Sequence, residues 1–320
     1  MEALLPYIQF LEKELQAYAF PKKPENLYDP LRYFMQIGGK RIRPVLSFLG
    51  AELFGGQKED ALPIALSIEF FHNFSLIHDD IMDEAPLRRG HETVHQKWNT
   101  NIAILSGDVL LVHAYQALSK SEQIAQLLPV FNQTAIEVCE GQQMDMDFEQ
   151  RSDVQIAEYI EMIRLKTSVL LGCALKMGAL QAGASEEDAL LLYEFGQELG
   201  IAFQIQDDLL DLFADPEKFG KQVGGDVIAN KKTLLYLLAE GLVSHTDSMI
   251  LKELVHETDL TYKVRKTQEI YERIGARFAC EQAMEQHYQQ AMKALAQIQV
   301  PQERKQTLIY LADALMVREY

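Results

Sequence analysis

The placement of proline restricts this chain to helices more strongly than any other feature of its sequence. The ten prolines leave residues 130–215 and 217–300 without any, and both stretches are rich in Ala, Leu, Glu, Gln, Lys and Met. A proline inside a helix costs about 3 kcal/mol, so long proline-free stretches of good helix formers favour helices. Runs of alternating β-branched residues between Asn-Gly or Asp-Gly turns, which would indicate strands, are missing. We therefore expect an all-α fold.

Local patterns agree with helices and predict some of their ends. Apolar residues recur every three or four positions over 105–115 and 201–212, as they do on one buried helix face. Ser185 is expected to cap a helix, because the three acidic residues that follow it would lie in the first turn. The turn-forming stretches 28–30 and 55–56 are expected to interrupt helices. No linker or change of composition divides the chain, so we expect a single domain over residues 1–320.

The overall charge and the cysteines bear on partners and compartment. The chain has 30 Lys and Arg residues against 47 Asp and Glu residues, a net charge of −17. Such a surface repels nucleic acids and anionic lipids, so neither is expected as a partner. Cys139, Cys173 and Cys280 are widely spaced, which favours a reducing compartment. Residues 1–20 show no signal peptide, and no uninterrupted apolar run reaches the roughly 18 residues that cross a bilayer. We expect a cytoplasmic protein without a membrane span.

Two copies of an aspartate cluster carry the strongest chemical signal. Each copy has the form Asp-Asp-x-x-Asp after an apolar helical stretch, and the members are Asp79, Asp80, Asp83, Asp207, Asp208 and Asp211. Residues four apart lie on one helix face, where like charges repel and are costly to bury without compensation. Carboxylates without His or Cys favour Mg²⁺, which shares its remaining positions with water and substrate phosphates. A solvated acidic helix face would explain one copy, whereas two copies favour a magnesium site.

Basic residues gather near these clusters in a chain that is otherwise short of them. Lys40, Arg41 and Arg43 follow two glycines, and Arg88 and Arg89 come shortly after the first cluster. Further basic residues occur within three short segments, 164–167, 219–226 and 230–233. The planar guanidinium of arginine matches phosphate oxygens, and lysine adds a point charge. Any one pair alone would suit a solvated surface, but together with the aspartates they predict a metal-and-cation site for two diphosphates.

With these motifs identified, the sequence resembles the trans-isoprenyl diphosphate synthases (polyprenyl synthetases) over nearly its whole length. The family's elements appear in order: GGKRIRP at 38–44, DDIMD at 79–83, LRRG at 87–90, GQQMD at 141–145, LKT at 165–167, GIAFQIQDDLLD at 200–211, GKQVGGD at 220–226 and NKKT at 230–233. The resemblance implies a helical bundle of the isoprenoid synthase type, with a central cavity lined by two aspartate-rich helices. It also implies head-to-tail condensation of an allylic diphosphate with isopentenyl diphosphate.

The resemblance further implies roles for individual residues. Three Mg²⁺ ions would be bound by Asp79, Asp83 and Asp207, with Asp80, Asp208 and Asp211 nearby. The allylic diphosphate would be held by Arg88, Lys166, Lys221 and Lys231. Isopentenyl diphosphate would be held by Lys40, Arg43, His72 and Arg89, with Gly39 allowing close approach of the backbone. Gln142 and Asp145 would support the metal site from a neighbouring helix. A buried core histidine is the alternative for His72, because it lies among phenylalanines.

The mechanism implied by the resemblance is ionisation, condensation and elimination. Metal ions and cations such as Arg88 would stabilise the charge that develops on the departing diphosphate. The carbonyl of Lys166 and the side-chain oxygens of Thr167 and Gln204 would stabilise the allylic cation. The proton would be lost to the released diphosphate, so no side-chain base is expected. Closure of segment 221–232 over bound diphosphate is a further hypothesis, because glycines cluster there between lysines.

Product length is inferred from the residues upstream of the first cluster. In this family the growing chain extends back along the helix that carries the aspartates, where Phe74 lies about 7.5 Å and Phe71 about 12 Å before Asp79. An aromatic residue at the fifth upstream position resembles short-chain synthases, and the small Ser75 at the fourth position differs from animal farnesyl-type enzymes. We expect geranylgeranyl diphosphate, with farnesyl diphosphate as the alternative. The competing view is that both phenylalanines are core residues and that another helix limits the chain.

Three other functions compete with this interpretation. A class I terpene cyclase shares the first aspartate motif, but its second motif normally resembles (N/D)DxxSxxxE, whereas residues 207–211 are DDLLD. A non-catalytic partner subunit has typically lost aspartates, and both clusters are complete here. A structural helical bundle leaves the basic motifs unexplained. Family members are usually homodimers, and the Ala- and Leu-rich stretch around 103–118 is a candidate interface.

Overall fold

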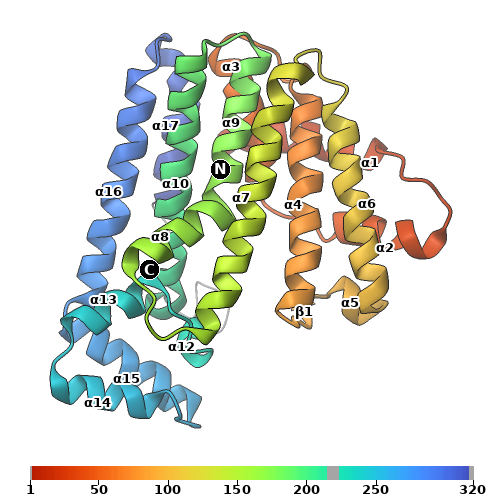
Figure 1. The fold of residues 1–320 in the computed structure, drawn as a ribbon. Coiled ribbons are helices and arrows are strands. Elements are labelled where there is room, and N and C mark those ends of the chain that lie inside the picture. Colours follow the sequence, from red (N-terminus) through yellow and green to blue (C-terminus); the bar gives the residue numbers. More distant parts are fainter. Residues whose placement is uncertain (1, 215–222, 317–320) are drawn as a thin grey trace. The chain divides into compact units, whose positions relative to one another are not determined.

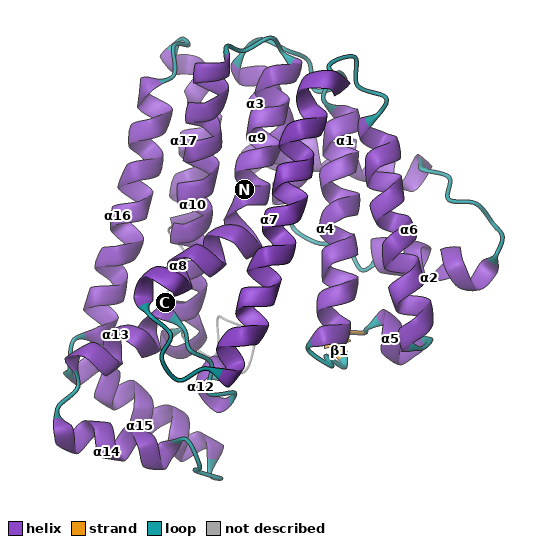
Figure 2. Ribbon diagram, in the orientation of Figure 1, coloured by secondary structure: helices purple, strands orange, loops and turns teal. Residues whose placement is uncertain are grey.

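In the computed structural model the chain folds almost entirely into helices, which confirms the expected all-α class (Figure 1, Figure 2). The structure describes residues 2–214 and 223–316. Within those residues the only strand pairing joins β1 (Leu87–Arg88) and β2 (His91–Glu92), a two-residue antiparallel ladder. The described chain divides into two compact units, and each is treated separately below. The expectation of a single domain stays a prediction.

The described residues of the first unit are 2–133, 170–193 and 298–307. Its elements are η1 (Glu2–Leu4), α1 (Leu5–Ala17), α2 (Glu25–Gln36), α3 (Ile42–Leu53), α4 (Leu62–Met82), β1, β2, α5 (Val94–Lys97) and α6 (Thr100–Leu118), together with most of α9 (Val169–Gln181). Three further helices contribute part of their length to each unit: α7 (Ile124–Gln150), α10 (Glu186–Phe213) and α17 (Gln302–Met316).

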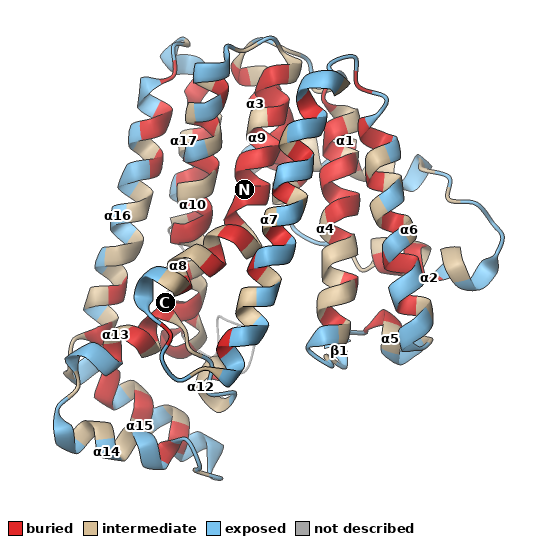
Figure 3. Cartoon of the chain, viewed as in Figure 1, coloured by how far each residue is buried: buried red, intermediate tan, exposed pale blue. Residues whose placement is uncertain are grey.

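Helix α4 is the centre of the first unit, and it packs against α3 and α6. Its buried positions include Ile64, Ile68, Phe70 and Phe71, so the first half of the helix belongs to the core (Figure 3). Burial of each such side chain is worth about 1.5–3 kcal/mol, which holds α4 in place up to the turn that carries the first aspartate cluster. The packing of α4 therefore positions that cluster.

The described residues of the second unit are 134–169, 194–214, 223–297 and 308–316. Its remaining elements are α8 (Ile156–Ile163), the single π turn η2 (Arg164–Ser168), α12 (Gly225–Ile228), α13 (Leu234–Leu242), α14 (His245–Leu254), α15 (Leu260–Arg273) and α16 (Ala276–Gln297). Thr233, Ser244 and Asp259 cap α13, α14 and α15, because each side chain accepts a hydrogen bond from the backbone N–H three residues later. Ile205, Leu209, Leu235, Ile270 and Cys280 belong to the buried core.

The structure corrects one predicted helix end and confirms two others. The interruption expected at residues 28–30 is wrong, because α2 continues through Pro30. Pro30, Leu31 and Phe34 are all buried, so tertiary packing outweighs the local cost of the proline. The end at residues 55–56 is confirmed, because α3 stops at Leu53. The Ser185 cap is also confirmed, since its Oγ accepts a hydrogen bond of 3.1 Å from the Asp188 N–H.

Helix α6 is the one helix in the described chain that is long and apolar enough to cross a membrane by length and composition alone. Its apolar composition is partly explained by packing, because α6 lies against α4 and α2 and buries Ala103, Leu110 and Ala114. The same helix leaves Leu105 and Val112 exposed, by 56% and 65%. The packing of α6 therefore accounts for one of its faces, and the exposed face requires a separate explanation.

Candidate active site

Both aspartate clusters lie at the carboxyl ends of long helices. Asp79 and Asp80 occupy the last turn of α4, and Asp83 is its C-cap. Asp207 and Asp211 lie in the last two turns of α10. The carboxyl end of a helix carries partial negative charge, so carboxylates there are destabilised in addition to repelling one another. Each cluster therefore requires positive charge, which metal ions or basic side chains can supply.

Arg88 provides part of that charge in the first unit. Its Nε donates a 2.7 Å hydrogen bond to Asp80 Oδ1, and its Nη2 lies 3.4 Å from Asp79 Oδ2. Asp80 is 1% exposed, and burial raises the pKa of its carboxyl although Arg88 opposes that shift. The buried Asp80 Oδ2 makes no hydrogen bond within the described residues. The arrangement places an arginine against the first cluster and leaves a buried carboxylate oxygen available to a cation.

The predicted residues for the second diphosphate also come together in the first unit. Arg43 Nη1 and His72 Nε2 are hydrogen-bonded at 3.3 Å, and the Arg89 guanidinium donates to the Gly38 carbonyl. A Cβ at Gly39 would lie 2.6 Å from Arg89 Nη1, so a side chain there would displace the Arg89 guanidinium. Burial and then the neighbouring guanidinium groups, with Arg43 first among them, lower the pKa of His72 well below its ordinary value. A neutral imidazole and converging guanidinium groups form an anion-binding surface.

Lys40 extends from the same loop and is exposed. Its neighbour Arg41 points the other way, into the interior, and is 5% exposed. Arg41 Nε donates a 2.7 Å hydrogen bond to Glu12, Nη1 donates to buried Glu69, and Nη2 donates to the Met35 carbonyl at 3.0 Å. The residue has a left-handed backbone, with φ of 50°. Arg41 thus fixes the loop between the two predicted ligands, a role that the sequence did not indicate.

Replacing Arg41 by methionine is expected to destabilise the protein by about 3–5 kcal/mol, because it leaves the buried Glu69 carboxylate without its partner. Chemical denaturation followed by circular dichroism would measure the change. Arg265 on α15 is exposed, so Arg265→Met is the matched control and should change stability by about 0.5 kcal/mol or less. A loss below about 1 kcal/mol for Arg41→Met would show that the buried pair is not a structural anchor.

In the second unit, Asp208 faces inward and is 5% exposed. Its carboxylate accepts hydrogen bonds from Tyr159 Oη at 2.5 Å, the Leu234 N–H at 3.4 Å and Gln204 Nε2 at 3.5 Å. Burial raises the pKa of this carboxyl to about 8. The Oδ2 of Asp211 accepts a 2.9 Å hydrogen bond from the Asp226 N–H. The middle aspartate of the second cluster is thus tied to α8 and α13, and Asp211 holds the start of α12.

The LKT motif lies in the π turn η2, which the sequence did not predict. Lys166 Nζ donates a 2.5 Å hydrogen bond to Asp145 Oδ2 on α7. A Cβ at Gly141 would lie 2.2 Å from the Lys166 backbone nitrogen, so Gly141 lets α7 touch the turn. Isolated π turns inside helices are frequent at functional sites because they redirect one turn of side chains. Gly141 and Asp145 of GQQMD therefore place Lys166, a contact that the sequence did not indicate, and the predicted support of the metal site by Gln142 and Asp145 stays a prediction.

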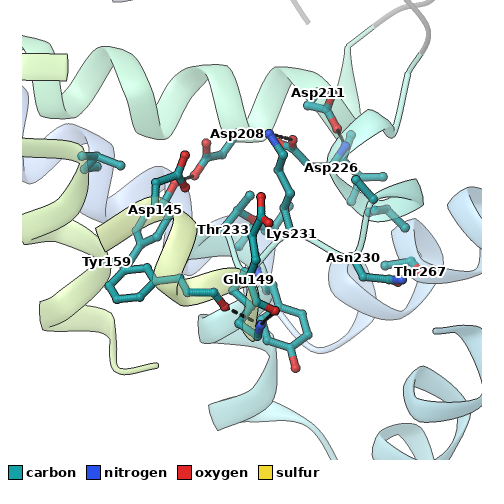
Figure 4. Close-up of a pocket in the computed structure, with 18 of the residues that line it drawn as sticks. Asp145, Glu149, Tyr159, Asp208, Asp211, Asp226, Asn230, Lys231, Thr233 and Thr267 are labelled. Atoms are coloured by element: carbon teal, nitrogen blue, oxygen red, sulfur yellow. Dashed lines mark hydrogen bonds and ion pairs between the residues drawn. The ribbon is translucent and has the colours of Figure 1, made fainter. Parts of the chain in front are cut away.

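A cavity of about 670 Å³ opens beside these residues within the second unit (Figure 4). The charged and hydrogen-bonding residues of its lining are Asp145, Glu149, Tyr159, Lys166, Thr167, Gln204, Asp208, Asp211, Asp226, Asn230, Lys231, Lys232, Thr233, Tyr236, Lys263, Thr267 and Tyr271. Burial and the nearby Asp211 carboxylate raise the pKa of Asp226 to about 6, while Lys231 Nζ lies 4.0 Å from it. No role was assigned to Asp226 from the sequence alone, although its place in the GKQVGGD motif indicates that it lies near the site.

The proposed chain-length residues lie one turn apart on α4. Phe71 is 1% exposed and its ring lies 5.6 Å from that of Phe74 and 5.4 Å from that of Phe131. Phe74 is only partly buried, and Ser75 Oγ donates to the His72 carbonyl at 2.8 Å. Lys221 lies outside the described residues, so its role and the closure of segment 221–232 stay predictions.

Comparison with known proteins supports one family. A sequence model described as polyprenyl synthetase matches residues 24–274. A short chain isoprenyl diphosphate synthase of Methanothermobacter thermautotrophicus is 36% identical over 323 residues, covering 100% of this chain and 99% of that protein. A geranylgeranyl diphosphate synthase of Methanosarcina mazei is 47% identical over 221 residues, 68% of each chain. A crystal structure of a geranylgeranyl pyrophosphate synthase has a TM-score of 0.94 at 44% identity over 99% of both chains. Geranylfarnesyl diphosphate synthases also occur among the relatives at 41% identity.

Proposed function

Because the chain belongs to the polyprenyl synthetase family, we propose that it is a short-chain prenyltransferase that condenses isopentenyl diphosphate with allylic diphosphates. The observation that carries the proposal is that basic side chains lie at both aspartate clusters: Arg88 contacts the first cluster, and Lys166 and Lys231 line the same cavity as Asp208 and Asp211 of the second. A terpene cyclase has no need of the second anion-binding surface formed by Arg43, His72 and Arg89.

The family uses Mg²⁺, and the residues present suit that ion. The donors are hard carboxylate oxygens, and one of them, Asp80 Oδ2, is buried without a hydrogen bond within the described residues. We propose that three ions are held by Asp79, Asp83 and Asp207, with Asp80, Asp208 and Asp211 close behind. Since Asp208 already accepts three hydrogen bonds, a supporting role suits it better than direct ligation. When bound, Mg²⁺ supplies charge neutralisation for the departing diphosphate.

The basic residues divide between the two substrates. Arg88, Lys166, Lys221 and Lys231 would hold the allylic diphosphate, and Gly39, Lys40, Arg43, His72 and Arg89 would hold isopentenyl diphosphate. Their preorganised positive charge stabilises diphosphate more as the carbon–oxygen bond breaks than before, which lowers the barrier. For the second substrate, the hydrogen bond between Arg43 and His72 and the contact of Arg89 with Gly38 hold the binding groups before substrate arrives.

The reaction forms one carbon–carbon bond and releases one diphosphate and one proton. The allylic carbon–oxygen bond breaks first, and the electron pair leaves with diphosphate. The oxygen dipoles of Lys166, Thr167 and Gln204 would stabilise the allylic cation; all three residues line the cavity. The double bond of isopentenyl diphosphate then attacks this cation. The proton lost from the adjacent carbon goes to the released diphosphate, which requires no side-chain base.

We propose geranylgeranyl diphosphate as the main product, with farnesyl diphosphate as the alternative. The test is a product assay with Mg²⁺ and labelled isopentenyl diphosphate, run separately with dimethylallyl, geranyl and farnesyl diphosphates. The dephosphorylated products would be sized by chromatography. A geranylgeraniol peak is expected from every starter. A peak at farnesol or geranylfarnesol would change the proposed product length and leave the proposed prenyltransferase activity unchanged. If no starter is extended, the prenyltransferase proposal fails, and cyclisation of geranylgeranyl diphosphate becomes the function to test.

We further propose that the protein is a homodimer whose interface includes the exposed face of α6. Leu105 and Val112 lie seven residues apart, hence on one face, and a second copy would cover them. Light scattering after gel filtration should give twice the chain mass of 36.5 kDa, and Val112→Asp should give a monomer. Met249→Asp, at a residue 54% exposed on α14, is the control and should stay dimeric. A monomeric wild type at micromolar concentration would contradict the proposal.

A cytoplasmic location stays a prediction.

A further inference from the structure

The segment from Gly224 to Thr233 brings three charged residues, Asp226, Lys231 and Lys232, to the cavity in the second unit (Figure 4). One end of the segment is held by α10, because Asp211 accepts hydrogen bonds from the Gly224 and Asp226 N–H groups at 2.5 and 2.9 Å. Farther along, Lys232 Nζ donates to the Phe148 carbonyl at 2.6 Å, at the end of α7. Lys231 lies between these anchors and is exposed, so its direction depends on the turn before it.

That turn is made by Asn230, which has a left-handed backbone with φ of 53°. Such a conformation is uncommon for residues other than glycine, although asparagine tolerates it better than most. The Asn230 N–H donates to the Val227 carbonyl at 3.2 Å, and the Lys231 N–H donates to the Asp226 carbonyl at 2.9 Å. These two backbone hydrogen bonds close the turn. The side chain of Asn230 takes no part in them and can connect the turn to the rest of the unit.

The side chain that fixes Asn230 is Lys263, from α15. Lys263 is 3% exposed, and its Nζ donates to Asn230 Oδ1 at 2.7 Å, to the Val255 carbonyl at 3.3 Å and to the Ile228 carbonyl at 3.4 Å. Ile228 is the last residue of α12 and Val255 is the C-cap of α14, so one ammonium group serves two helix ends and the turn. Burial lowers the pKa of Lys263. A buried lysine is costly, and this one has three oxygen acceptors arranged around it.

We propose that Lys263 is a positioning residue for diphosphate binding: by holding Asn230 in its left-handed turn, it directs Lys231 into the cavity. The inference rests on the proposed function, because Lys231 is there assigned to the diphosphate. Lys263 itself has its three donors engaged and acts through the turn. Replacement by methionine keeps the length of the side chain and removes the donors, so the turn would keep only the 3.4 Å hydrogen bond from Asn230 Nδ2 to the Val255 carbonyl, while the apolar stem of the side chain still packs.

A double-mutant cycle on diphosphate binding tests the proposal. The four proteins are the wild type, Lys263→Met, Lys231→Ala and the double variant, and the probe is inorganic pyrophosphate with Mg²⁺, titrated by calorimetry. We expect each single variant to weaken binding by about tenfold, the worth of one charge-assisted hydrogen bond. The double variant should bind no more weakly than Lys231→Ala, because Lys263 acts only through Lys231. Additive losses, or an unchanged affinity for Lys263→Met, would overturn the proposal.

Two controls separate positioning from a general loss of structure. Lys266→Met, one turn along α15 and paired with Glu269 at the surface, should bind pyrophosphate as the wild type does. Asn230→Gly keeps the left-handed backbone and removes the acceptor of Lys263, so it should reproduce the loss, and it replaces Lys263→Met in the cycle if that variant does not fold. Hydrogen exchange should show faster exchange of the Lys231 amide in both anchor variants. Because the probe is pyrophosphate, this result does not depend on prenyl transfer. If the wild type shows no prenyl transfer but the losses in pyrophosphate affinity are non-additive, the proposed function is rejected and the positioning role of Lys263 stands.

Discussion

Replacing Asp79 or Asp207 by alanine is expected to lower kcat by at least about 10³-fold, because each removes a ligand of the ions that stabilise the departing diphosphate. The same variants should be about as stable as the wild type in the absence of metal. Both residues lie near the carboxyl end of a helix with like charges beside them, which offsets favourable contacts such as that of Asp79 with Arg88. Loss of activity without loss of stability is the signature of a ligand rather than of a structural residue.

The measurement is steady-state turnover at saturating substrates and Mg²⁺, with thermal unfolding of the same samples. Asp60 is exposed in the turn before α4, so Asp60→Ala is the matched control and should keep full activity. If the Asp79→Ala or the Asp207→Ala variant keeps more than about a tenth of the wild-type turnover, the substituted aspartate is not a ligand of the catalytic metal ions. A variant that is inactive because it is unfolded would fail the stability measurement and would be replaced by the corresponding asparagine variant.

Much of the fold could be predicted because its signals are local. Long stretches without proline, the serine cap at Ser185 and the glycines after Leu53 each act within a few residues, and the structure confirms what they predict. The interruption expected at Pro30 was wrong because that residue is buried with Leu31 and Phe34, and the free energy of that contact is invisible in a short sequence window. The same reason hides the π turn at Lys166, which depends on the approach of α7 at Gly141.

The residues of the site also fall into those that the sequence could identify and those that it could not. The aspartates and basic motifs could be identified because their spacing along the chain indicates shared helix faces and clustered charge, and the resemblance to a family gave them roles. Residues that act by supporting others could not be found. Arg41 is adjacent to two predicted ligands, and only the burial of its guanidinium against Glu69 reveals a different task. Lys263 has no motif at all, since its three acceptors come from α12, the turn after it and the end of α14. Such residues are recognised by burial and partners, which sequence does not contain.

Replacing Phe74 by alanine is expected to change the main product to one that is longer by a single five-carbon unit. On the proposed path of the growing chain back along α4, Phe74 is the first of the two phenylalanines that the chain meets, about 7.5 Å from Asp79. The next barrier is Phe71, one turn farther and about 4.5 Å deeper along the helix axis. Phe71 is packed against Phe131 and is 1% exposed, so it should stay in place when Phe74 is removed. The space gained is therefore limited to about one turn of helix.

The measurement is product size by chromatography with farnesyl diphosphate as starter, compared with the wild type. Phe71→Ala is the control, because in that variant Phe74 still blocks the chain first and the product should not change. The double variant should then release the limit and give a broader, longer set of products. An unchanged product for Phe74→Ala would place the end of the pocket on another helix. A longer product from Phe71→Ala alone would mean that the chain passes Phe74 in the wild type, and that Phe71 is the residue that sets its length.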